Sequence, residues 1–132
     1  MQFVEAFERL GYIVEAPRQD WSAEKEDGVC ISLWRKEMDA RDGLLWMDTR
    51  THAGPIDEWQ DKSGNRKRIR HLRRALEEFG GHVDVVIVSG DPGVGYGTAQ
   101  PWVAEGGRSG TFWEVTKLED ETGHFEVRLQ RA

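Results

Sequence analysis

The chain has 132 residues, of which 38% are hydrophobic and 32% are charged, and its formal net charge is −6. This length predicts a single domain over residues 1–132, and the composition excludes an intrinsically disordered chain. No apolar run approaches the ~20 residues of a membrane span, and the acidic start of the chain lacks the features of a signal peptide. We therefore expect a cytoplasmic protein without a membrane partner.

The first half of the chain predicts one short helix and two strands. Residues 3–10 carry apolar side chains at helical spacing, and Gly11 follows as a helix stop. Residues 18–28 are polar and indicate a loop or an exposed edge. Alternating side chains predict a strand over 29–34, and a shorter strand follows over 44–48. The turn sequence between these two strands favours a hairpin.

The clearest helix lies in the middle of the chain. Residues 49–64 are polar and predict mostly loop, whereas 65–79 predict a helix that the pair Gly80-Gly81 ends. Residues 82–89 read HVDVVIVS, which is short, apolar and β-branched. This run predicts a buried central strand directly after the helix.

A glycine-rich segment covers residues 89–110, where seven of 22 residues are glycine and two are proline. This composition excludes a regular helix or a central strand, so we expect a long loop, and loops of this length in compact domains are usually functional. A hairpin of two strands, 111–118 and 124–130, ends the chain. The order of elements predicts an α+β fold with a small, mostly antiparallel, curled sheet, a partial barrel being one form of it, and two helices.

The usual catalytic and metal-binding patterns are absent from the sequence. The glycines of 91–97 follow a strand as in a phosphate-binding loop, but no helix and no Gly-Lys-Ser/Thr follow them. Glu114 and Lys117 would lie on opposite faces of a strand, which argues against a metal nuclease, and no histidines have ligand spacing. We therefore expect no metal and no cofactor, and we identify no catalytic residues. His52, which lies near acidic residues, leaves an acid–base cluster as an alternative, and the single cysteine, Cys30, is expected to be a buried strand residue.

The strongest signal is a run of basic residues in the predicted helix. Residues 65–74 hold six of the 18 basic residues and no acid. At ~100° per residue, five of them fall within an arc of about 120°, beside the apolar stripe, and Arg68 lies elsewhere. The five are Arg66, Lys67, Arg70, Arg73 and Arg74. Such an arc is typical of a phosphate-binding face, and a solvated face neutralised by the acidic body is the alternative.

Aromatic side chains in loops suggest a surface for stacking. The chain has six tryptophans, and Trp102 and Tyr96 fall in the glycine-rich segment. Together with the basic helix they predict a nucleic-acid-binding module, modified bases included, that grips phosphates and stacks on a base.

Two alternatives remain open. One is a small enzyme or small-molecule-binding domain with its site between the glycine-rich segment and the His52 region. The other is a protein-interaction domain that uses the basic helix on an acidic partner, including a second copy in a homodimer.

Overall fold

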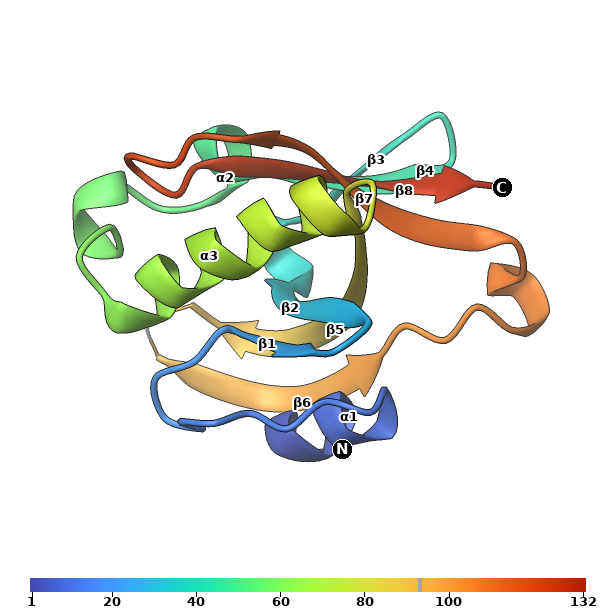
Figure 1. Cartoon of the computed structure of the whole chain (residues 1–132), viewed down its shortest axis with the longest axis horizontal. Helices are drawn as coiled ribbons and strands as arrows, with labels where there is room; N and C mark the ends of the chain where they lie inside the picture. Colours follow the sequence, from blue (N-terminus) through green and yellow to red (C-terminus); the bar gives the residue numbers. More distant parts are fainter. Residues whose placement is uncertain (93) are drawn as a thin grey trace.

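The computed structural model describes residues 1–92 and 94–132, so Gly93 of the predicted glycine-rich loop lies outside the described residues (Figure 1). The described α-helices are α1 Phe3–Arg9, α2 Thr49–His52 and α3 Ser63–Glu78. The strands are β1 Ser22–Lys25, β2 Gly28–Trp34, β3 Asp39–Arg41, β4 Leu44–Asp48, β5 His82–Asp91, β6 Gly95–Pro101, β7 Thr111–Leu118 and β8 Phe125–Arg131. Within these ranges, no helix is both long and apolar enough to cross a membrane.

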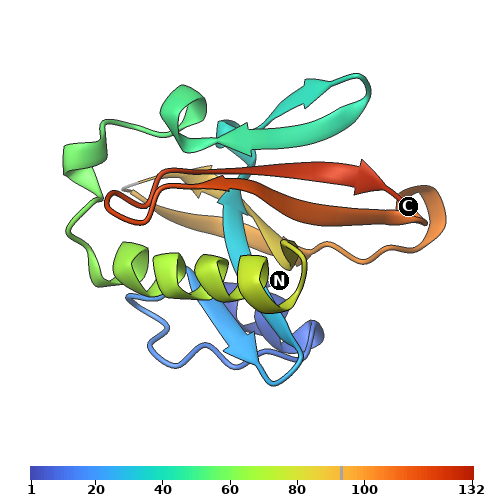
Figure 2. The same ribbon diagram turned by 45° about the horizontal axis from the view of Figure 1, so that its top comes forward.

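The strands form one open, mostly antiparallel sheet in which β5 is shared by two halves. The order is β1-β2-β5-β7-β8-β4-β3, and β6 pairs with β5 as a further strand. The first residues of β5 pair with β7, whereas the later ones pair with β6 on one side and, in parallel, with β2 on the other. Figures 1 and 2 show the two halves diverging, with α3 alongside them. The predicted α+β class and both predicted helices, α1 and α3, are confirmed, and α2 adds a single turn.

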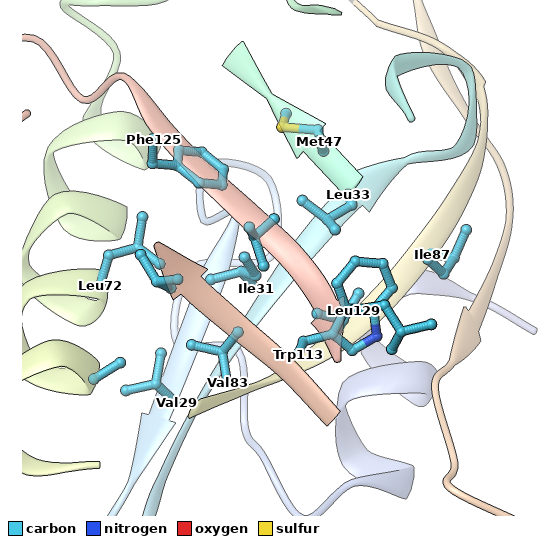
Figure 3. Close-up of a cluster of buried hydrophobic side chains, with 14 residues drawn as sticks. Val29, Ile31, Leu33, Met47, Leu72, Val83, Ile87, Trp113, Phe125 and Leu129 are labelled. Atoms are coloured by element: carbon cyan, nitrogen blue, oxygen red, sulfur yellow. The ribbon is translucent and has the colours of Figure 1, made fainter. Parts of the chain in front are cut away.

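Two hydrophobic clusters fill the space on either side of β2 and β5. The larger cluster lies between the sheet and α3, and Leu72 of the helix packs there with Ile31 and Trp113 (Figure 3). The smaller cluster lies under α1 and includes Phe7 and the buried, free Cys30. Because β2 and β5 send side chains into both clusters, each reads as an apolar run, which is typical of a buried central strand.

The predicted pairing of strands 29–34 and 44–48 is wrong. β2 pairs with β1 and β5, while β4 pairs with β3 and β8. β2 is buried on both faces and therefore takes a central place in the sheet, whereas the turn at Asp42 and Gly43, both with positive φ, joins β4 to its own short partner. The polar segment 18–28 contains the edge strand β1.

The predicted loop over 89–110 is wrong over residues 89–91 and 95–101, which lie in strands, whereas residues 102–110 form a connection with one 3-10 turn. β5 continues to Asp91, and β6 pairs with it after a register shift between Val88 and Gly90. Glycine and proline are tolerated here because β6 is an edge strand, where one row of backbone groups needs no partner and a bulge is readily formed.

Gly64, in the first turn of α3, lies where this helix closely approaches the segment before β1. A Cβ atom at Gly64 would lie 2.4 Å from the carbonyl oxygen of Gln19 and 2.7 Å from the indole of Trp21. We expect Gly64→Ala to lower the free energy of unfolding by about 1–3 kcal/mol, because backbone and indole must both move. Gly107→Ala, whose Cβ meets nothing within 4 Å, is the matched control and should change it little. Urea denaturation measures both, and equal stability of the two variants would contradict the close approach.

Candidate functional site

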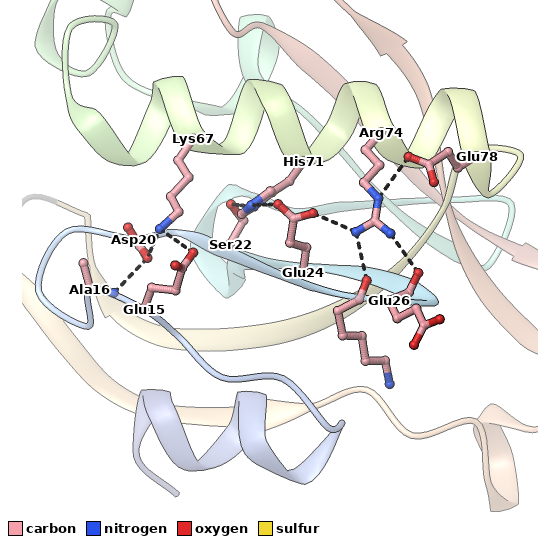
Figure 4. Close-up of polar contacts among 11 residues, drawn as sticks. Glu15, Ala16, Asp20, Ser22, Glu24, Glu26, Lys67, His71, Arg74 and Glu78 are labelled. Atoms are coloured by element: carbon pink, nitrogen blue, oxygen red, sulfur yellow. Dashed lines mark hydrogen bonds and ion pairs between the residues drawn. The ribbon is translucent and has the colours of Figure 1, made fainter.

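Three of the five cations predicted to form a phosphate-binding face are held by acids of this chain. Nζ of Lys67 lies 2.9 Å from the Asp20 carboxylate and 3.0 Å from Glu15 (Figure 4). Arg74 donates to the carboxylates of Glu24 and Glu78 and to two backbone carbonyls at 2.8 Å.

Of the other three cations of the predicted arc, one is paired with an acid and two are not. Arg73 pairs with Asp120, with Nε 3.0 Å from its carboxylate. Arg66 and Arg70 are exposed and have no acidic partner among the described residues. The structure thus leaves two of the five predicted cations available to an external anion.

Arg68, which the sequence placed off this arc, is buried at only 8% exposure. Its guanidinium carbon lies 4.8 Å from the ring centre of Trp21, 4.7 Å from Phe125 and 5.7 Å from Trp59. One long hydrogen bond of 3.4 Å joins Nη2 to Asn65, and Nε has no partner among the described residues. Burial lowers the pKa of Arg68 to about 10, although Glu37 opposes this shift.

A cavity of about 820 Å³ lies beside Arg68. Its walls include four aromatic side chains from separate segments of the chain, namely Trp21, Trp34, Trp59 and Tyr96. The ring of Tyr96 stacks between Trp34, at 5.2 Å, and Phe3, at 4.6 Å. Tyr96 therefore packs against one face of the indole of Trp34. We call this cavity the aromatic pocket.

The polar lining of the aromatic pocket is dominated by positive groups. Lys62, Ser63 and Gly64 line it at the start of α3, where no side chain caps the helix. The N–H groups of Ser63 and Gly64 have no hydrogen-bond partner among the described residues, so the positive end of a 16-residue helix faces this region. Burial raises the pKa of the lining carboxyl of Glu37, and Arg68 acts against that shift.

Comparison with known protein families, curated proteins and solved structures found no match.

Trp102, the other predicted stacking residue, lies away from the aromatic pocket. Its Nε1 donates to Thr111 at 3.1 Å, its ring packs edge-on against Trp113, and the Arg108 guanidinium lies 3.9 Å above it. It lines a separate cavity of about 560 Å³. The structure thus does not bring Tyr96 and Trp102 together. Trp34 and Arg68 are the residues that the sequence interpretation missed, because their neighbours come from distant segments.

His71 joins a chain of contacts that has the residue types of a hydrolase triad. Ser22 Oγ lies 2.7 Å from His71 Nδ1, and His71 Nε2 lies 3.0 Å from the Glu24 carboxylate (Figure 4). Ser22 is 1% exposed and His71 2%, so a substrate has no access to the serine. We interpret this chain as a structural link that fixes α3 against β1.

This link predicts a pH dependence of stability. Burial lowers the pKa of His71 below its usual value, with Glu24 opposing the shift. Protonation therefore favours the unfolded state, and the contribution of neutral His71 is present above pH ~6.5 and is lost as the pH falls through its folded pKa.

We expect His71→Gln to reduce this loss between pH 7 and 5, as measured by urea denaturation across that range. His124, whose pKa burial also lowers, is present in both proteins and cancels in the comparison. Identical pH slopes for the two proteins would show that His71 does not carry the dependence.

Proposed function

We propose that the protein is a nucleic-acid-binding module that holds one unstacked base in the aromatic pocket. The observation that carries this proposal is the pocket itself, which combines indole walls with a buried, unpaired guanidinium. Proteins that take a base out of its stack hold it between aromatic side chains and bind its polar edge with hydrogen-bonding groups. The pocket offers both kinds of contact.

A row of free cations leads away from the pocket. Lys62, Arg66 and Arg70 follow one another at intervals of four residues, and each is exposed without an acidic partner in the described part of the chain. The helical rise separates neighbours by ~6 Å, and Lys62 itself lines the pocket. We call Lys62, Arg66 and Arg70 the cation row, and we propose that backbone phosphates flanking the bound base lie along it.

The position of the pocket also favours a second candidate, a free planar molecule. Val94, Gly95 and Tyr96 from the glycine-rich segment meet His52 and Ala53 on its wall. The sequence predicted a small-molecule site between these two regions. The net charge of −6 repels nucleic acid at long range, which favours a small ligand. The two candidates share the pocket and differ in whether the cation row contributes.

The cation row is tested by Arg66→Gln combined with Arg70→Gln. A fluorescent single-stranded oligonucleotide should bind the unmodified protein with an affinity that falls as salt rises. The slope of log K against log salt should be about −2 for three phosphate contacts, and the double variant should bring it near −0.7. Fluorescence anisotropy between about 50 and 200 mM salt measures both slopes.

Arg73→Gln is the matched control for the cation row. It removes a charge that Asp120 already neutralises, so the salt slope should stay unchanged. Absence of binding to single- or double-stranded nucleic acid at low salt, modified bases included, would overturn the proposal. Binding of free nucleosides that the double variant leaves intact would instead support the second candidate.

The pocket is tested by Trp34→Leu, which shortens the stacking wall but keeps an apolar side chain. We expect weaker oligonucleotide binding by about 1–3 kcal/mol, because one base loses its stacking partner. The salt slope should not change, since no phosphate contact is lost. Circular dichroism checks that the fold is retained, and unaltered affinity in a folded variant would exclude stacking on Trp34.

A further inference from the structure

Arg68 is a buried charge that forms no ion pair with an acid of the described residues. A guanidinium has five N–H donors, yet Arg68 makes a single hydrogen bond of 3.4 Å, to Asn65, and its Nε makes none. Arg74 on the same helix, by contrast, donates to two carboxylates and two carbonyls. Aromatic rings surround this guanidinium but supply no full negative charge, so an anion at Arg68 would offset part of the cost of burying it.

The surroundings of Arg68 supply more positive potential than negative. The uncapped start of α3 lines the same pocket and adds its unpaired N–H groups. Arg18 and Lys62 lie on the wall, and Lys36 does too, although Asp91 pairs with it.

Two acids also line the pocket. Glu37 and Glu58 both line the pocket, but neither forms an ion pair with Arg68. Burial raises the pKa of Glu37 and Arg68 opposes that shift, so the two groups attract each other without forming an ion pair, and Glu58 is exposed. The pocket lining thus has an excess of basic over acidic side chains beside its aromatic walls.

We infer that the ligand is a planar ring bearing an anionic group, and that this group binds Arg68 and the start of α3 while the ring packs against the indoles. The inference rests on the proposed function of the pocket. If the ligand is nucleic acid, this pocket selects a base with an acidic substituent, such as a carboxyl group. Ordinary bases are neutral, and the phosphates of the strand lie along the cation row, outside the pocket. In a free ligand the anion can equally be the phosphate of a nucleotide.

Matched pairs of probes test this preference. One pair is a single-stranded oligonucleotide with one 5-carboxycytosine against the same strand with 5-methylcytosine. A second pair is orotate against uracil, and a third is cytidine 5′-monophosphate against cytidine. Quenching of tryptophan fluorescence gives each Kd, and we expect the anionic member of the base and orotate pairs to bind at least tenfold more tightly. A preference confined to the third pair would assign the anion to a phosphate instead of a ring substituent.

Two substitutions connect the preference to its cause. Arg68→Met keeps an unbranched side chain between the aromatic rings without the charge, and it should abolish the preference by weakening binding of the anionic probes at least tenfold more than that of the neutral ones. Glu37→Gln removes the lining carboxyl group that attracts Arg68, and should strengthen binding of the anionic probes only. If Arg68→Met does not fold, the inference is tested by the probe pairs on the unmodified protein and on the Glu37→Gln variant.

The outcomes separate this inference from the proposed function. Equal affinities within every pair overturn the inference, although binding of both oligonucleotides would still sustain the nucleic-acid proposal. Preferred binding of orotate without any oligonucleotide binding would keep the inference and overturn the nucleic-acid proposal. Absence of binding by all six probes overturns both.

Discussion

The position of helix α3 is the constraint on which both the fold and the pocket depend. Leu72 and Ala75 bury its inner face in the larger cluster. Asn65, 1% exposed, donates to the carbonyls of Gln60 and Thr122, and so joins the start of the helix to the turn just before it and to the distant β7–β8 turn. His71 joins the same helix to β1. With the start and the middle of the helix fixed, its first turn and the side chain of Arg68 are held in place at the pocket wall.

The basic residues of α3 lie in different environments. Acids neutralise three of them: Lys67 pairs with the segment before β1, Arg73 with the β7–β8 turn and Arg74 with β1. These pairs are at least partly exposed, so each contributes modestly to stability, but together they remove most of the repulsion along the helix. Arg66 and Arg70 remain free on the surface, and Arg68 is buried. A single run of basic residues therefore lies in three different environments.

The aromatic pocket is built where four segments of the chain converge. Trp21 precedes β1, Trp34 ends β2, Trp59 lies in the turn before α3, and Tyr96 belongs to β6. A pocket of this kind is usually largely pre-formed, with a few polar groups that fix the orientation of the ligand. Here the stack of Phe3, Tyr96 and Trp34 stiffens one wall, and the guanidinium of Arg68 supplies the polar group. This arrangement accounts for more of the candidate function than the basic arc does.

The sequence by itself determined the elements whose pattern is local. The helices over 3–10 and 65–79, the central strand that begins at His82 and the final hairpin follow from periodicity and from glycines at their ends. Only the tertiary structure decided which strands pair, because β2 and β4 are close in sequence but find better partners elsewhere, and β6 forms only because β5 offers it a free edge. The same holds for the site. Helical spacing separates Arg68 from its basic neighbours, but its burial among Trp21, Trp59 and Phe125 arises from contacts between segments far apart in the chain, which no local pattern records.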